Sequence, residues 1–277
     1  MKFPEYSVSL LIWIIPICAM IFFFIKKRLL SPEKIFAMLA TIVVLASVGI
    51  SLDLFFAKIF FTFPNKEAVC GLWIMDIPVE EFVFYIAGFW FILFIYVFCD
   101  EWHLKKYNRP DRTYARFRSR IKRRLFLHMR SVWWGLIVVA IGIVVKRIAN
   151  PEGCLVPGYF IFLVILAYVP YFLFYRITKS FVNWRAYFFS LVITVLISII
   201  WEVTLALPRG YWGFQKGAML GIFIGVWNNV PIEEITVWIF CTFVILLYEF
   251  LKICYFTPMP SVPGHKLLLR IGREWRN

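Results

Sequence analysis

The chain has 277 residues, of which 62% are hydrophobic and 20% aromatic, and it carries a formal net charge of +14. A soluble domain is nearer half apolar, so this chain holds more apolar surface than a water-soluble core can bury. These values exclude an ordinary soluble domain. The basic residues stand between the apolar runs, which favours a membrane protein over a nucleic-acid-binding protein.

Seven apolar runs are long enough, or nearly long enough, to cross a bilayer as helices. Crossing takes about 20 apolar residues in a helix. In chain order the predicted spans are 7–25, 35–57, 78–98, 132–145, 158–175, 186–208 and 231–251, of which the fourth is the shortest. We therefore predict an all-α, multi-pass integral membrane protein with about seven transmembrane helices.

Lysine and arginine counts predict the orientation of the chain. The segments after spans one, three, five and seven hold 23 of these residues, and the N-terminus with the other segments holds 7. Basic residues gather on the cytoplasmic side of multi-pass proteins. We therefore expect the C-terminus in the cytoplasm and the N-terminus outside, in the cell (inner) membrane. The basic stretch from Lys105 to Arg130 is also suited to contact anionic lipid headgroups.

A short acidic block occurs twice, at the starts of the third and seventh spans. The sequence D-I-P-V-E-E fills residues 76–81, and N-V-P-I-E-E fills residues 229–234. A further acid, Asp53 or Glu202, lies late in the span before each block. A glycine and a tryptophan also precede each block, in the pairs Gly71 with Trp73 and Gly225 with Trp227.

This duplication divides the chain into two similar units. Residues 1–98 form a first three-helix unit, and residues 158–277 form a second one with a C-terminal tail. Residues 99–157 hold the basic segment and a linking helix. Because one helix joins the two units, they run in the same direction through the membrane and are parallel repeats.

Six carboxylates are predicted at similar depth near one face of the bundle: Asp53, Glu80, Glu81, Glu202, Glu233 and Glu234. A single Pro-x-Glu-Glu is typical of a helix start, because proline suits the first turn and acids complement the helix dipole. The repetition of the block favours a functional site instead, as does the high cost of carboxylates within apolar spans. If the two units pack around a pseudo-two-fold axis, the six acids converge on one cavity.

Such a cavity has a definite chemistry. Carboxyl groups packed in a dry pocket cannot all ionise, because burial and mutual repulsion disfavour the charged form. One that keeps its proton can deliver it to a substrate, and an ionised neighbour can take a proton back. Aromatic faces support a cation. The third span offers Phe82, Phe84, Tyr85, Phe89 and Trp90, each of which is also an ordinary packing or lipid-facing residue.

Other chemistries are not indicated by the sequence. His103, His128 and His265 form no metal-ligand pattern, and no glycine-rich nucleotide loop is present. We therefore expect no cofactor, no metal and no nucleic-acid partner. Cys70 and Cys154 fall in loops on one predicted face, and whether they pair is left open.

The acidic blocks resemble those of the membrane-embedded lycopene cyclases. That family occurs in bacteria and archaea as one fused chain or two small subunits, and in fungi as one domain of a bifunctional enzyme. It is separate from the flavin-dependent lycopene cyclases. The second unit matches best, with Trp201-Glu202, the run G-Y-W-G-F at 210–214 and the second block. The resemblance covers roughly residues 7–98 and 158–252, and the basic segment between them looks like an insertion.

The resemblance implies a carotenoid (lycopene-type) cyclase that acts on a hydrophobic carotenoid without net redox change. It implies Glu80, Glu81, Glu233 and Glu234 as the acid/base set, with Asp53 and Glu202 in support. We expect Glu→Gln at Glu233 or Glu234 to abolish ring formation and to leave the protein in the membrane.

Two other functions stay open at this stage. A proton- or cation-coupled transporter also uses repeated three-helix units and intramembrane acids. The third possibility is a non-catalytic membrane scaffold derived from the cyclases. Pigment analysis separates the enzyme from the scaffold, and proton-coupled uptake into vesicles identifies the transporter.

Overall fold

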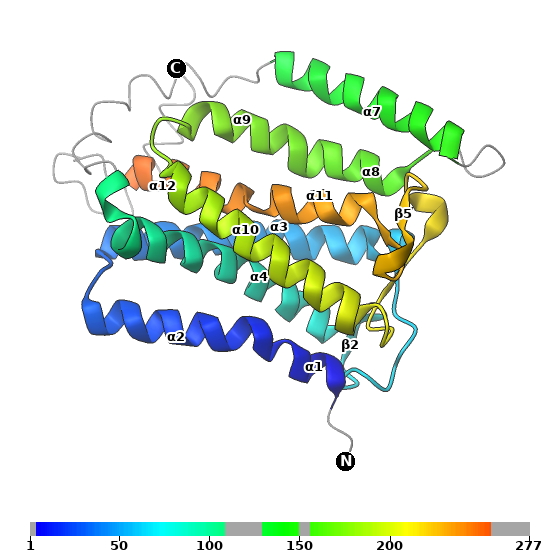
Figure 1. Ribbon diagram of the computed structural model, residues 1–277, viewed down its shortest axis with the longest axis horizontal. Helices are drawn as coiled ribbons and strands as arrows, with labels where there is room; N and C mark the ends of the chain where they lie inside the picture. The colour runs from blue at the N-terminus through cyan, green and yellow to red at the C-terminus, as the bar shows by residue number, and fades with distance from the viewer. Residues whose placement is uncertain (1–3, 109–128, 150–155, 256–277) are drawn as a thin grey trace.

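A computed structural model describes residues 4–108, 129–149 and 156–255. Figure 1 shows the helices side by side, roughly aligned with the long axis of the molecule. In chain order the helices are α1 (Glu5–Ser9), α2 (Leu11–Lys27), α3 (Pro32–Phe60), α4 (Val79–Phe98), α7 (Met129–Ala149), α8 (Gly158–Leu163), α9 (Val169–Thr178), α10 (Trp184–Trp201), α11 (Ile232–Cys241) and α12 (Phe243–Tyr255). Three π-helical segments extend or join them: η1 (Cys99–His103), η3 (Val164–Tyr168) and η4 (Glu202–Ala206).

Six spans among the described residues are long and apolar enough to cross a membrane. They are Glu5–Lys27, Pro32–Phe60, Val79–His103, Gly158–Thr178, Trp184–Ala206 and Ile232–Cys254. These spans match six of the seven predicted ones. The β-strands in the described residues are each only two residues long. The prediction of an all-α, multi-pass membrane protein is therefore confirmed.

The predicted fourth span forms helix α7, which lies along α8 and α9 at the edge of the bundle (Figure 1). Its passage through the membrane stays a prediction. Most of the basic segment before it, residues 109–128, lies outside the described residues, and so does Cys154. The expectations of lipid contact by the basic segment and of pairing with Cys70 therefore stay open.

Helix α4 is the most enclosed of the six spans. In its most apolar stretch 67% of the residues are buried, against 22% in the span that contains α2. It packs against α2, α3, α10 and α12, and a helix that is apolar all round is stable in such a central place. The outer helices expose large apolar side chains, such as Phe55 with 76% of its surface accessible, to the region that lipid would fill.

The glutamate pair of each acidic block follows a short β-hairpin. The strands pair antiparallel, β2 (Trp73–Ile74) with β3 (Ile77–Pro78) and β5 (Phe223–Ile224) with β6 (Val230–Pro231). Pro78 faces Trp73, whereas Pro231 faces Phe223. The structural counterpart of Trp73 is thus Phe223, and the predicted match with Trp227 is wrong. The second turn is longer than the first, and Trp227 lies within it as part of a 3-10 turn.

The backbone supports this corrected register. Gly71 and Gly221 both have positive φ, 87° and 95°, at the entrance to their hairpins, a conformation in which a β-carbon is strained. Gly225, which the sequence paired with Gly71, is not among the positive-φ residues. The two hairpins therefore correspond through Gly71 and Gly221, with extra residues in the second turn.

A third strand pair joins the two units at the same end of the bundle. Strand β1 (Phe61–Thr62), which follows α3, pairs antiparallel with β4 (Gly213–Phe214), which follows α10. A β-carbon on Gly213 would lie 2.9 Å from the Thr62 hydroxyl oxygen, so this close approach needs glycine. The end of the bundle that carries β1 to β6 is called the hairpin end below.

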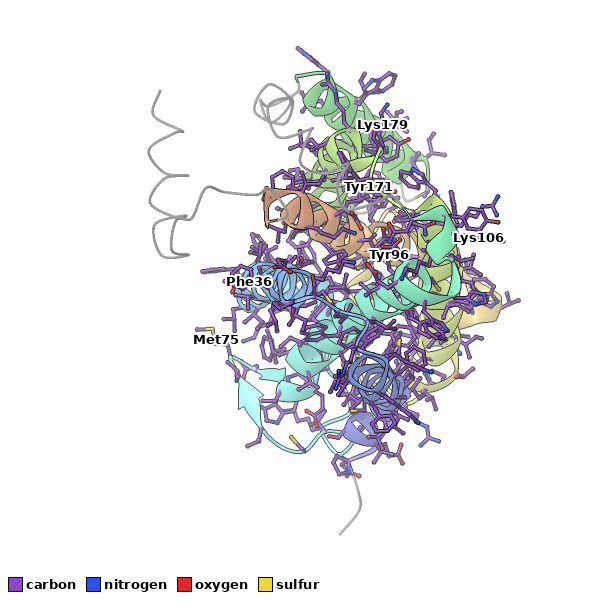
Figure 2. All side chains as sticks on the ribbon, turned by 90° about the vertical axis from the view of Figure 1, so that its left-hand side faces the viewer. Phe36, Met75, Tyr96, Lys106, Tyr171 and Lys179 are labelled. Atoms are coloured by element: carbon purple, nitrogen blue, oxygen red, sulfur yellow. The ribbon has the colours of Figure 1, made fainter. Side chains whose placement is uncertain are left out.

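Buried charges gather at the opposite end of the bundle. The Lys252 ammonium lies 2.9 Å from a Glu249 oxygen and 3.7 Å from an Asp100 oxygen. The Tyr96 hydroxyl donates to Glu249 at 2.9 Å. Figure 2 looks onto this end, with Tyr96 inside the bundle and Lys106 and Lys179 toward its rim. Burial of these charges in an apolar bundle is stable only because they are paired.

A second ion pair extends this group. The Lys34 ammonium of α3 lies 2.6 Å from Glu101 of η1, and the Asn183 side-chain amide donates to Asp100 at 3.1 Å. The far-end ion cluster therefore joins α3, η1 and α12, and it consists of Lys34, Asp100, Glu101, Glu249 and Lys252. The sequence analysis did not identify it, because its members are spread over 219 positions of the chain.

Candidate active site

The six predicted acids all lie at the hairpin end of the bundle, and all are buried. Asp53 stands about two turns before the end of α3. Glu202 begins η4, the π-helical segment that continues α10; such wide turns are frequent at functional sites. The glutamate pairs occupy the first turns of α4 and α11, directly after the hairpin prolines.

One cavity at this end is lined by both Glu81 and Glu234. The space that protein atoms leave empty there is about 530 Å³, part of which is open to the outside, and most of the wall is aromatic or aliphatic. The other lining residues are Phe61, Phe84, Tyr85, Gly88, Phe89, Ile92, Tyr159, Trp212, Val237, Trp238 and Cys241. The second glutamate of each block thus faces the same apolar space, although the two lie 153 positions apart in the chain.

Asp53 and Glu202 stand next to these glutamates. Glu81 interacts electrostatically with both Asp53 and Glu234, and Glu202 interacts with both Glu234 and Glu81. Both carboxyl oxygens of Glu202 are buried without a hydrogen-bond partner among the described residues. Four of the six acids therefore form one interacting group, and two of the four line the cavity.

The indole N–H groups of Trp238 and Trp212 are among the groups that interact with Glu202. The Trp238 N–H does not reach hydrogen-bonding geometry with any described group. A buried carboxyl without hydrogen bonds is costly as an anion.

Glu80 and Glu233, the first glutamates of the two blocks, point elsewhere. Glu80 accepts hydrogen bonds from the Ser7 hydroxyl at 2.5 Å and from the Cys70 N–H at 2.6 Å. Glu233 accepts one from the Leu220 N–H. Neither lines the cavity. Each one ties its helix start to the segment that leads into the hairpin.

Two tyrosines that the sequence analysis missed hold the cavity glutamates. The Tyr6 hydroxyl donates to Glu81 at 2.8 Å, and the Tyr159 hydroxyl donates to Glu234 at 3.2 Å. Each tyrosine stands 75 residues before its glutamate. That equal separation is present in the sequence, and it could have identified both tyrosines once the acidic blocks had been aligned.

The described residues include no group of three or more His, Cys, Asp or Glu placed to hold a metal ion. Of the three histidines only His103 is described, and it ends η1 at the far end of the bundle. The chemistry that the cavity itself offers is proton transfer, from carboxyl groups to a substrate that enters an aromatic space.

A family model described as Lycopene cyclase matches residues 6–99 and 157–251, which together make up more than half of the chain. The chain belongs to the lycopene cyclase family. Each matched stretch contains one of the two tyrosines that bind a cavity glutamate, one of the two hairpins and one acidic block. No curated protein and no solved structure matched the chain.

The family makes this protein a carotenoid cyclase in general terms, and its aromatic cavity agrees with an apolar polyene substrate. Of the five aromatics predicted on the third span, Phe84, Tyr85 and Phe89 line the cavity. Phe82 packs instead with Ala57 and Ile77. Trp90 stacks on Phe94, with ring centroids 4.7 Å apart, on another side of α4.

Replacing Tyr159 by phenylalanine is expected to lower the cyclisation rate of this family member about tenfold, the effect of losing about one hydrogen bond to a carboxyl group. Tyr6→Phe should act similarly on Glu81. The rate is measured as cyclic carotenoid formed per amount of enzyme in membranes. Tyr175→Phe is the matched control, because Tyr175 lies on α9, away from the cavity. Equal rates in all three variants would contradict the role of these hydroxyls.

Proposed function

We propose that the protein closes the end ring of a linear carotenoid by proton transfer, without net redox change. A carboxylic acid adds a proton to the terminal double bond of the substrate. The internal double bond attacks the resulting cation and closes a six-membered ring. Loss of a proton to a carboxylate then forms a β- or ε-ionone ring. The proton gained equals the proton lost, so the product is an isomer of the substrate.

The observation that carries this proposal is the placement of Glu81 and Glu234 in one aromatic cavity. We assign these two residues as the acid and base that reach the substrate. Asp53 and Glu202 lie close enough to influence their protonation. A carboxyl in a dry, preorganised site transfers a proton more effectively than one in water.

Ring closure needs stabilisation of the carbocation in addition to an acid and a base, and the cavity wall supplies it. The faces of aromatic rings attract positive charge, tryptophan most strongly. Trp212, Trp238 and Phe84 all line the cavity beside the two glutamates. Their rings also pack on one another, with centroids 5.3 Å apart for Phe84 and Trp212 and 5.7 Å apart for Phe84 and Trp238, so they are held in place before the substrate arrives.

Glu80 and Glu233 have a different role in this proposal. Their hydrogen bonds to Cys70 and Leu220 fix the loops that shape the hairpin end. This assignment divides the six acids into two that react, two neighbours and two that position backbone. It revises the expectation for Glu233, whose replacement should lower activity less than that of Glu234.

The two units act together in this mechanism. The equal tyrosine-to-glutamate separation and the paired hairpins support parallel repeats, each of which contributes one reactive carboxyl to a single site. With the N-terminus outside, the site lies toward the outer face of the cell membrane, as the distribution of Lys and Arg favours.

Expression of the chain in a lycopene-producing bacterium tests the function. We expect the red linear pigment to be converted into cyclic carotenoids, which chromatography separates by retention and absorption. Unchanged lycopene, with the protein shown to be folded and in the membrane, would contradict the proposal. Proton-coupled uptake by vesicles under those conditions would favour a transporter instead.

A further inference from the structure

Helix α7 inserts one basic side chain into the second unit. Lys146 lies in the last turn of α7 and none of its surface is accessible to solvent. Its ammonium donates to the backbone carbonyls of Gly217 at 3.2 Å, Lys216 at 3.4 Å and Met219. A buried ammonium is stable only when its hydrogen bonds and its charge are satisfied. These carbonyls provide its three acceptors.

The carbonyls that bind Lys146 belong to the loop that holds Glu233. Residues 216–218 form a short 3-10 turn, and Met219 follows it with no exposed surface. The next residue, Leu220, donates its N–H to the Glu233 carboxylate. Lys146 also interacts electrostatically with Glu233. The connection from α7 to the acidic block therefore runs through the loop 216–220, and its shortest path leads from Met219 to the adjacent Leu220.

The first unit holds its matching loop in a different way. There the Tyr6 N–H donates to the Ala68 carbonyl at 2.9 Å, and the Cys70 N–H and the Ser7 hydroxyl both donate to Glu80. The support thus comes from α1, the start of the same unit. In the second unit, the loop before the block is bound by a residue of the linking helix.

We propose that Lys146 is a positioning residue of the active site. It fixes the loop 216–220 and, through the Leu220 N–H, the Glu233 carboxylate at the start of α11. The linking helix α7 is then part of the framework that places Glu234 in the cavity, in addition to joining the two units. The effect on catalysis rests on the proposed function, whereas the effect on the loop does not.

Hydrogen exchange and cyclisation kinetics on the full-length protein in lipid nanodiscs test the proposal. Lys146→Met removes the donors and keeps the length of the side chain. Amide exchange in residues 216–222 is expected to rise by about tenfold or more, the effect of losing buried hydrogen bonds. Exchange in residues 68–74, the matching loop of the first unit, should not change.

The same variant should lower kcat about tenfold with little change in KM, because misplacement of Glu234 affects the proton-transfer step more than the apolar binding of the substrate. Lys146→Arg should restore most of the kcat. In a Glu233→Met background, Lys146→Met should cause little further loss, because methionine at position 233 cannot accept the Leu220 hydrogen bond and both changes therefore break the same connection. A purely structural role would lower the rate further in that background.

Arg147→Met is the matched control, since Arg147 is the exposed neighbour of Lys146. Unchanged exchange in residues 216–222 of Lys146→Met, or equal effects of Arg147→Met, would overturn the proposal. If Lys146→Met does not accumulate, Lys146→Gln takes its place under the same criteria. A wild-type protein that forms no cyclic product would contradict the proposed function, while the exchange data would still decide the role of Lys146.

Discussion

Replacement of Glu234 by glutamine is expected to lower ring formation by a factor of about 100 or more, which is the effect of losing a positioned general acid or base. Glutamine has nearly the same shape and can still accept the Tyr159 hydrogen bond. It cannot release or take up a proton, so the cavity stays formed while the chemistry stops. Glu81→Gln should have an effect of the same size, since Glu81 lines the same cavity. The measurement is the ratio of cyclic to linear carotenoid at equal protein in the membrane.

Two kinds of control separate the loss of an acid or base from a general effect of replacing glutamate by glutamine. Glu67→Gln changes an exposed glutamate at the same end of the bundle and should keep full activity. Glu80→Gln and Glu233→Gln, which weaken loop contacts, should reduce activity by a smaller factor. Full activity in Glu81→Gln, in Glu234→Gln and in the double variant would remove the acid/base assignment.

Lys252→Met is expected to lower the free energy of unfolding by about 3 kcal/mol or more, because it leaves buried carboxylates without their cation. Lys252 lies within hydrogen-bonding distance of Glu249 and close to Asp100 in the far-end ion cluster. The variant keeps the aliphatic part of the side chain, so the loss reports on the charge rather than on packing. Unfolding by a denaturing detergent in mixed micelles, followed by size-exclusion chromatography, measures the change.

Lys179→Met provides the comparison, because Lys179 is exposed near the same end and should change stability little. Adding Asp100→Asn to Lys252→Met should recover part of the lost stability, since it removes one of the unpaired charges. A stability of Lys252→Met equal to that of Lys179→Met would show that the far-end ion cluster does not stabilise the bundle.

The ends of six helical spans could be predicted to within five residues. The predicted spans 7–25 and 158–175 compare with Glu5–Lys27 and Gly158–Thr178 in the structure. This agreement has a simple cause, because in lipid the backbone must satisfy its own hydrogen bonds. A long apolar run without charges therefore becomes a helix in almost any context.

The flanks of the acidic blocks could not be predicted in the same way. Trp227 precedes its proline by one residue less than Trp73 does, but Phe223 is the residue that lies opposite the proline. Hairpin register depends on the length and dihedral angles of the turn, and the second turn has gained residues. Spacing counted back from the proline is misleading as soon as the turns differ in length.

The role of each glutamate within a pair could also not be predicted from the sequence. Neighbouring residues in a helix point about 100° apart, so two adjacent glutamates need not face the same cavity. Glu81 and Glu234 face it, and Glu80 and Glu233 bind loop backbone. Which of the two turns inward depends on how α4 and α11 are rotated against their neighbours, and side-chain packing sets that rotation.

The sequence by itself determined that the chain crosses a membrane several times, that an acidic block is repeated, and that it resembles the lycopene cyclases. These properties depend on composition and on local order along the chain. Only the tertiary structure decided that Glu81 and Glu234 share a cavity, that Tyr6 and Tyr159 hold them, and that Lys146 binds the loop behind Glu233. Such contacts join residues that are tens of positions or more apart, and they follow from the packing of whole helices.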